Sequence, residues 1–298
     1  MRFSDALELL LLASLWGASF LFMRVAGPEF GPIALSLLRA VIAALLLLPF
    51  LLLRTGAAEL KIHWKKLAVV GVLNSAIPFC LLALATISLS GGFAAILNAT
   101  APLWAAVIAW IWLADKLGGS RIVGLVIGFV GVVVLVANKI GLEAPGVPLA
   151  ILAALTAAFF YGLGANFTKK YMQGISTLAV ATGSMLAAAI VLLPGAVLLW
   201  PDDPVSIQAW LAIIVMGIAS TGIAYVLYFR LIVNVGPAKA ITVTYLIPGF
   251  AVIWGAIFID EKLTTNMVIG GAIILAGTAL ATGMLSLNRK SELTHDDS

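Results

Sequence analysis

Three prolines follow a polar residue by four positions inside apolar stretches of the chain. The pairs are Asn74–Pro78, Asn98–Pro102 and Thr244–Pro248. Proline cannot donate the helical hydrogen bond that the carbonyl oxygen four residues earlier would accept, so each pair leaves a backbone acceptor at a polar residue. Two interpretations stay open. Neighbouring helices satisfy these acceptors, or the acceptors line a wet cavity and bind donors of a small molecule, such as an ammonium group.

Side chains that could catalyse a reaction are missing from the middle of the apolar stretches. No Asp or Glu lies near the middle of an apolar stretch, His63 and His295 lie in polar segments, and Cys80 is the single cysteine. Metal-dependent hydrolysis needs clustered His or carboxylates, and nucleophilic catalysis needs a base beside Ser or Cys. We therefore expect no enzyme, no metal site and no cofactor. A proton relay is not expected either, because Glu8, at the edge of the first stretch, is the nearest candidate.

The composition predicts an all-α integral membrane protein. Of 298 residues, 63% are hydrophobic and 10% are charged, whereas soluble domains carry about 25% charged residues. With a net charge of +4 and no cluster of basic and aromatic residues, nucleic-acid binding is not expected. A membrane helix needs about 20 apolar residues. Ten such stretches are predicted, at 7–25, 33–53, 67–88, 92–113, 122–138, 148–168, 177–199, 209–232, 237–259 and 266–286.

The basic residues predict the orientation. Ten spans place both termini on one side, and most of the 17 Lys and Arg residues fall in segments on that side. Basic residues favour cytoplasmic loops. We expect a multi-pass protein of the cell's inner membrane with both termini in the cytoplasm, including a tail at 288–298.

The sequence contains an internal duplication. Residues 64–138 align with 210–284 at an offset of 146, which pairs identical or similar residues in order. Examples are Pro102 with Pro248, Asp115 with Glu261, Lys116 with Lys262, and, at an offset of 145, Arg24 with Lys169. The predicted repeats are 1–140 and 147–287. Since each holds five spans, an odd number, the second enters the membrane from the opposite side, as in secondary transporters.

Several segments resemble the drug/metabolite transporter superfamily, EamA type. They are Leu15-Trp16-Gly17-Ala18-Ser19-Phe20, Leu38-Arg39-Ala40, Ala94-Ala95-Ile96-Leu97 continuing to Pro102-Leu103, Gly124 to Gly131, and Glu261-Lys262-Leu263-Thr264. Within it, the chain looks like a YddG-type amino-acid exporter. The resemblance implies two four-helix bundles around a central cavity, with the fifth helix of each repeat at the periphery.

The duplication extends the set of candidate site residues. Ser220 corresponds to Asn74, Thr244 to Asn98, and Tyr225 to Phe79. Deep aromatic residues need a polar partner or a cavity. The predicted cavity residues are Trp16, Phe20, Asn74, Phe79, Asn98, Tyr161, Ser220, Tyr225, Thr244 and Tyr245, with kinks or hinges at Pro78, Pro102 and Pro248.

Arg39 is a candidate charge site well inside its stretch. Its side chain reaches outward or bonds to carbonyls in one interpretation, and meets a substrate carboxylate in the other.

These observations predict a carrier that exports small neutral or zwitterionic metabolites, foremost amino acids and including hydrophobic and aromatic ones, by alternating access. The alternative is efflux of drugs or other metabolites on the same scaffold. Expected partners are a small-molecule substrate and the lipid bilayer, with the chain a monomer or a weak dimer. The sequence leaves open the metabolite, the direction of flux and its coupling.

Overall fold

The computed structural model describes residues 2–54, 57–137 and 146–285, and this part of the chain folds into helices without a β-strand. The predicted tail at 288–298 lies outside the described residues. The helices are α1 (Phe3–Arg54), α2 (Ala58–Gly71), the π-helix η1 (Val72–Ala76), α3 (Ile77–Ser88), α4 (Gly91–Asn98), α5 (Ala101–Leu113), α6 (Gly119–Val136), α7 (Val147–Tyr171), α8 (Thr177–Leu198), α9 (Ile207–Val215), the π-helix η2 (Met216–Ile223), α10 (Ala224–Val235), α11 (Pro237–Ala240), α12 (Val243–Ile259) and α13 (Thr265–Ala281).

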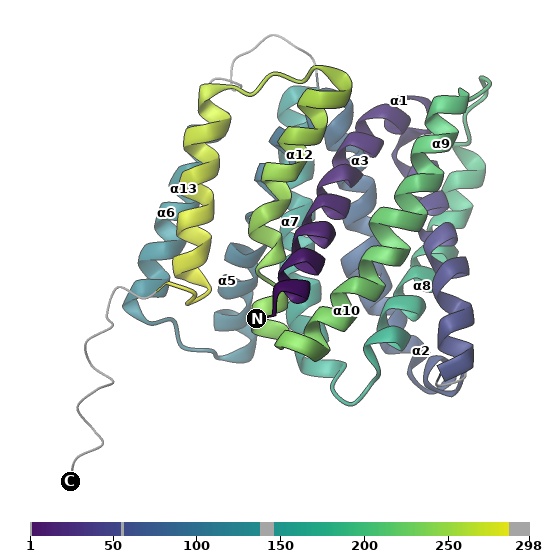
Figure 1. Ribbon diagram of the computed structural model, residues 1–298, viewed down its shortest axis with the longest axis horizontal. Coiled ribbons are helices and arrows are strands. Elements are labelled where there is room, and N and C mark those ends of the chain that lie inside the picture. The colour runs from purple at the N-terminus through teal and green to yellow at the C-terminus, as the bar shows by residue number, and fades with distance from the viewer. Residues whose placement is uncertain (1, 55–56, 138–145, 286–298) are drawn as a thin grey trace.

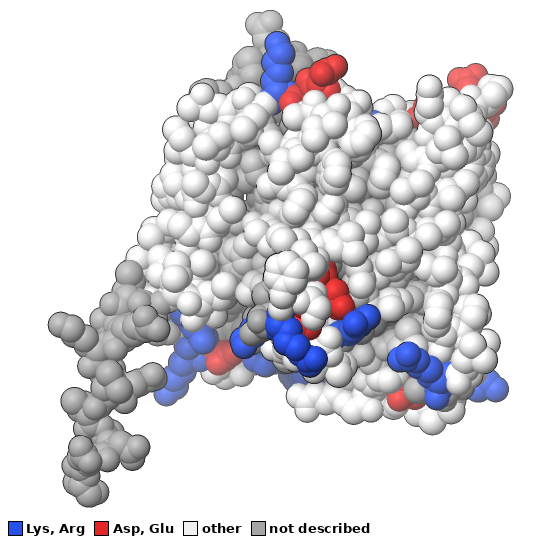
Figure 2. All heavy atoms as spheres, in the orientation of Figure 1, with Lys and Arg blue, Asp and Glu red and all other residues white. Residues whose placement is uncertain are grey.

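The bundle has the surface of a membrane protein. Seven helical segments among the described residues are long and apolar enough to cross a bilayer, and α12 and α13 are shorter apolar helices. Large apolar side chains face outward, for example Leu53, Val233 and Ile111 at 85%, 82% and 72% exposure. Lys and Arg gather mainly along one end, the lower end in Figure 2, and most of the face between the two ends is uncharged. This arrangement confirms the predicted all-helical membrane fold.

Helix α1 joins two of the predicted apolar stretches. Its 52 residues would extend about 78 Å as one straight helix, well beyond a bilayer core of about 30 Å. Gly31 breaks it with φ 71° and ψ 162°, and Pro28 and Pro32 flank the break. Figure 1 shows the first arm rising from the N-terminus to the upper end and the second arm returning. A left-handed φ favours glycine, so this turn depends on Gly31.

Two π-helical turns occupy matching positions in the duplicated sequence. Residues 72–76 form η1, and the positions 146 residues later lie inside η2. Pro78 follows η1 within the first turn of α3, whereas Ala224 holds its place after η2. The irregular turn therefore forms in both halves although only one of them carries a proline.

The predicted kinks at Pro102 and Pro248 differ in the structure. Pro102 stands at the start of α5, directly after a break at Ala99 and Thr100. Pro248 lies inside the continuous α12 instead. The break in the second half comes earlier, at 241–242, where the hydroxyl of Thr242 donates to the carbonyl of Lys239 at 2.7 Å. A hinge at Pro248 stays a prediction.

Helices α6 and α13 pack side by side at the edge of the bundle (Figure 1). Small residues permit the close approach: a Cβ atom at Gly277 would overlap the backbone of Gly128, and one at Gly131 would lie 2.7 Å from the nitrogen of Ile274. These are the last helices of the two predicted repeats, and their glycines correspond across the duplication, Gly124 to Gly270 and Gly131 to Gly277. The repeats thus contact each other here through nearly bare backbone.

Corresponding connections lie at opposite ends of the bundle. The α5–α6 connection, which contains Lys116, is at the lower end of Figure 1, and the α12–α13 connection, which contains Lys262, is at the upper end. This placement agrees with an inverted duplication. The inversion, the repeat boundaries and the count of ten spans remain predictions.

Candidate functional site

A cavity of about 650 Å³ occupies the centre of the bundle. Residues of α1, α3, α4, α5, α7, α10 and α12 line it, and its wall is mostly apolar. A volume of this size suits a small-molecule ligand. The cavity is the natural place to look for the predicted site.

Most of the predicted residues lie at the cavity wall. Those that do are Trp16, Phe20, Asn74, Phe79, Asn98, Tyr161, Tyr225 and Thr244, together with Pro102 and Arg39. Ser220 is fully buried behind the wall, and Tyr245 turns its hydroxyl to Thr282 Oγ1 at 2.9 Å. Pro78 and Pro248 are buried and do not line the cavity. What these residues bind stays a prediction.

Aromatic rings form one side of the wall. Trp16 on α1 lies 6.5 Å from Tyr225 and 5.3 Å from Tyr228 on α10, measured between ring centroids. Tyr228 also lines the cavity. Tyr228 follows Tyr225 by three residues, which puts both rings on one face of the helix. This spacing is the sequence signal that could have added Tyr228 to the predicted cavity residues.

Polar atoms interrupt this wall near the break between α4 and α5. The Oδ1 atom of Asn98 is buried and has no hydrogen-bond partner among the described residues. Thr244 donates its hydroxyl to the carbonyl of Ile241 at 2.9 Å, and the side chain of Asn74 packs against Gly164. A buried acceptor without a donor is costly, so Asn98 offers a place for a donor from a ligand or from water.

Arg39 brings a positive charge into the wall. Its side chain is 7% exposed, its Nε atom donates to Thr221 Oγ1 at 2.9 Å, and its Cζ atom lies 3.9 Å from the ring centre of Phe79. Tyr161 and Tyr225 are within electrostatic range of the guanidinium group. Among the described residues this hydrogen bond goes to a hydroxyl group, and the role of Arg39 stays a prediction.

The cavity opens at the lower end. Its lining extends to the exposed Asp115, beside Leu117 and Arg121. Asp115 Oδ2 lies 3.4 Å from Lys169 Nζ on α7, and the two side chains are 49% and 62% exposed. This pair therefore stands at the mouth in contact with solvent, where an ion pair contributes little stability.

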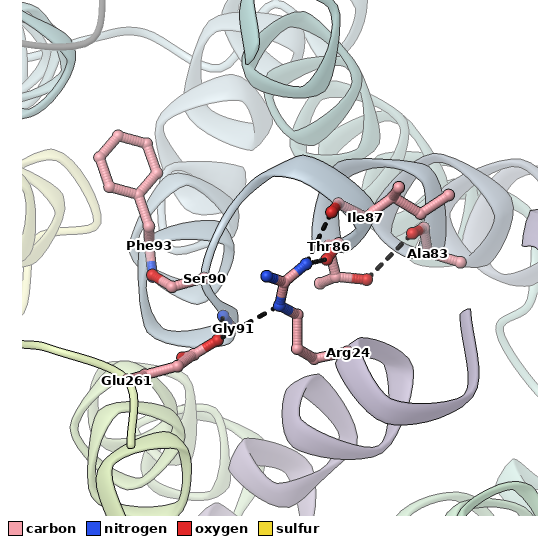
Figure 3. Close-up of polar contacts among 8 residues, drawn as sticks. All are labelled: Arg24, Ala83, Thr86, Ile87, Ser90, Gly91, Phe93 and Glu261. Carbon is pink, nitrogen blue, oxygen red and sulfur yellow. Dashed lines mark hydrogen bonds and ion pairs between the residues drawn. The ribbon is translucent and has the colours of Figure 1, made fainter. Parts of the chain in front are cut away.

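A second ion pair lies toward the upper end of the bundle. Figure 3 shows Arg24 of α1 beside Glu261, which follows α12, with Arg24 Nε 3.7 Å from Glu261 Oε1. Arg24 Nη1 donates to the carbonyls of Thr86 and Ile87 at 2.9 and 2.6 Å, and Glu261 Oε1 accepts from the backbone nitrogen of Gly91 at 2.9 Å. Neither Arg24 nor Glu261 lines the cavity. This cluster ties four segments together above it.

Left-handed residues position both carboxylates. Ala114 has φ 54° and caps α5, and Asp260 has φ 52° and caps α12. The nitrogens of the next residues, Asp115 and Glu261, donate to the carbonyls of Ala109 and Gly255 at 3.2 and 3.1 Å. Both caps stand at the same position of the duplicated sequence, so each half presents its acidic residue in the same way.

Sequence reasoning aligned the members of these pairs without assigning them to the site. It matched Arg24 with Lys169 and Asp115 with Glu261. In the structure Arg24 contacts Glu261, and their counterparts Lys169 and Asp115 contact each other. Each pair therefore joins the first half of the chain to the second.

Comparison with known proteins identifies the family. The profile of the EamA-like transporter family matches residues 6–137 and again residues 148–283. The chain belongs to the EamA-like transporter family. The predicted superfamily is thereby confirmed, and the chain is a membrane transporter by family. The match is to the family as a whole and does not assign the chain to the YddG-type exporters.

Relatives of similar length agree with this membership. The chain is 25% identical to the uncharacterized transporter YvbV of Bacillus subtilis, over 92% of this chain and 90% of the relative. It is 26% identical to the uncharacterized inner membrane transporter YedA of Escherichia coli, over 95% and 93%. The protein PecM of Dickeya dadantii is 23% identical, over 93% and 92%. A solved crystal structure of a protein at 21% identity matches the fold with a TM-score of 0.65, covering 95% of this chain and 99% of the other.

Proposed function

We propose that this EamA-like transporter is a ten-span carrier that exports small neutral or zwitterionic metabolites, foremost amino acids, across the inner membrane by alternating access. The observation that carries the proposal is a ligand-sized cavity in the centre of a membrane bundle, open at one end and closed at the other. A channel would need a continuous path, whereas a carrier exposes its site to one side at a time.

The two ion pairs suit two alternating states. In the described state the Arg24–Glu261 pair closes the upper end, and the counterpart pair Lys169–Asp115 stands at the open mouth. If the halves are related by inversion, the opposite state closes the lower end around Lys169 and Asp115 and leaves Arg24 and Glu261 in contact at an open upper mouth. With the basic lower end in the cytoplasm, the described state faces inward.

The cavity wall supports a zwitterionic substrate with an apolar side chain. Asn98 Oδ1 supplies an acceptor for an ammonium group, and the rings of Trp16 and Tyr225 supply an apolar surface that also attracts cations. The alternative substrates are lipophilic drugs. The apolar wall favours them too, but a buried charge and an unpartnered amide oxygen favour a polar ligand.

Export and counterflow assays test this proposal. Cells lacking their own amino-acid exporters would receive the gene and be scored for efflux of each amino acid. Purified protein in liposomes would then be assayed for exchange of labelled for unlabelled substrate. We expect saturable exchange, lowered at least tenfold by Asn98→Leu or Thr244→Leu at normal expression and Tm. Thr177→Leu, at an exposed position of α8 outside the cavity, is the matched control. Normal transport by both cavity variants would show that the site is elsewhere.

A further inference from the structure

Arg39 is a buried cation whose hydrogen-bonding capacity is largely unused. A guanidinium group has five N–H donors and is always charged. The described residues give Arg39 one hydrogen bond, from Nε to Thr221, and place no carboxylate within 4 Å of it. At 7% exposure inside a membrane bundle, such a charge is costly unless an anion, carbonyl groups or water in the cavity compensate it.

Arg24 shows what an arginine with a structural role looks like in the same chain. Its guanidinium group bonds two backbone carbonyls and an acidic side chain, all supplied by the protein. Arg39 has none of these and borders the cavity instead. The duplication adds a second contrast, because the position corresponding to Arg39 is Ser184, whose hydroxyl donates to the carbonyl of Ala181 at 2.9 Å. The other half forms this part of the bundle without a charge.

The surroundings of Arg39 leave one edge of the guanidinium group for a ligand. Phe79 covers a face at 3.9 Å, and Thr221 takes the Nε donor. The Nη donors remain, and their planar fork matches the two oxygens of a carboxylate. The other basic residue of the lining is Arg121, which lies with Asp115 and Leu117 at the lower mouth. A single positive charge at this depth balances a monoanion.

We infer that Arg39 is the receptor for the carboxylate group of the transported substrate. The inference rests on the proposed transport function and narrows it: the substrate carries a carboxylate, which Arg39 binds beneath Phe79, and Asn98 accepts from a donor elsewhere on the same molecule. Thr221 fixes the guanidinium plane through the Nε bond. Amides, esters and amines of the same shape are poor ligands because they leave the buried cation unpaired.

Binding of phenylacetate and of its neutral counterpart phenylacetamide tests the inference without requiring transport. Purified full-length protein in detergent would be titrated with each compound, with the thermal shift as the readout. We expect phenylacetate to bind at least tenfold more tightly than phenylacetamide. Equal affinities, tighter binding of the amide, or no shift with either compound would overturn the inference, and this comparison needs the wild-type chain only.

Three variants at two arginines then locate the charge. Arg39→Gln is expected to remove the preference for phenylacetate, Arg39→Lys to keep part of it, and Arg121→Gln, at the mouth of the same cavity, to leave it unchanged. A preference that survives in Arg39→Gln, or that disappears in Arg121→Gln, places the anion site elsewhere.

Failure of the amino-acid assays with intact phenylacetate binding would overturn the proposed substrates and leave the carboxylate receptor standing. The opposite result would retain transport and remove the receptor.

Discussion

Arg24 Nε lies 3.7 Å from Glu261 Oε1, and this contact joins the first half of the chain to the second at the end of the bundle opposite to the mouth of the cavity. Glu261 is only 13% exposed, and it also accepts from the backbone nitrogen of Gly91. The counterpart contact between Lys169 and Asp115 is exposed and stands at the open end. The difference in burial between the two pairs predicts a difference in strength, because solvent screens the exposed pair.

Neutralising Glu261 should open the upper end. In Glu261→Gln, Arg24 loses its counter-ion while its carbonyl contacts remain, so the closed state is destabilised by about 1–3 kcal/mol, or roughly fivefold to 150-fold in population. The measurement is labelling of Ala99→Cys, which lines the cavity, by an impermeant thiol reagent added outside cells in a Cys80→Ala background. Labelling should rise several-fold. Asp115→Asn is the control, and no rise is expected for it; unchanged labelling in Glu261→Gln would contradict a closing role.

Linking the lower pair should leave transport largely intact. Asp115 Oδ2 and Lys169 Nζ lie 3.4 Å apart while the mouth is open, and the counterpart pair Arg24–Glu261 is also in contact. The inverted duplication therefore predicts that the lower pair stays in contact when that mouth closes. A short thiol-reactive crosslinker between Asp115→Cys and Lys169→Cys, again without Cys80, should then lower exchange in liposomes less than threefold. Each single cysteine variant, treated in the same way, is the control. Loss of exchange that recovers after reduction would show that the two residues separate during transport.

The helical membrane fold could be predicted because its signal, the run of apolar residues, is local in the sequence. Apolar stretches report burial in lipid residue by residue, so the helical membrane fold follows directly from them. The left-handed residues Ala114 and Asp260 could not be predicted, because neither is glycine and each conformation is imposed by the cap that it closes. The π-helical turns were likewise hidden, since Pro78 marks one of them and Ala224 stands at the matching place of the other.

The site was harder to predict because the two halves do not stand in equivalent surroundings. Symmetry placed Ser220 in the cavity and the depth of its aromatic ring placed Tyr245 there, but both lie outside the lining. A cavity that opens at one end surrounds corresponding residues of the two halves differently. The contact between Arg24 and Glu261 spans most of the chain length. No local spacing signals such a pair, and the alignment of the halves indicates only that two pairs of one kind could exist.

The glycines between α6 and α13 predict a steric effect on stability. A methyl group at Gly277 would overlap the backbone of Gly128, so Gly277→Ala must push the helices apart. We expect the free energy of unfolding to fall by about 1–3 kcal/mol, seen as a lower Tm in detergent. Gly249→Ala in α12 is the matched control, because a Cβ atom there meets nothing within 4 Å. An equal Tm for both variants would contradict close packing of α6 on α13.

Transport is predicted to proceed without a proton relay through Glu8. Its Oε1 atom lies 3.0 Å from Arg230 Nη2, and Glu8 does not line the cavity, so a proton bound there has no direct contact with the substrate. Exchange in liposomes should therefore continue without a pH gradient, and Glu8→Gln should lower its rate less than threefold. Arg230→Gln breaks the same ion pair and separates the two explanations of any larger effect: a structural contact makes both variants equally slow, whereas a proton carrier makes Glu8→Gln alone inactive. Strict dependence on a pH gradient, abolished in Glu8→Gln and preserved in Arg230→Gln, would require proton coupling and refute the prediction.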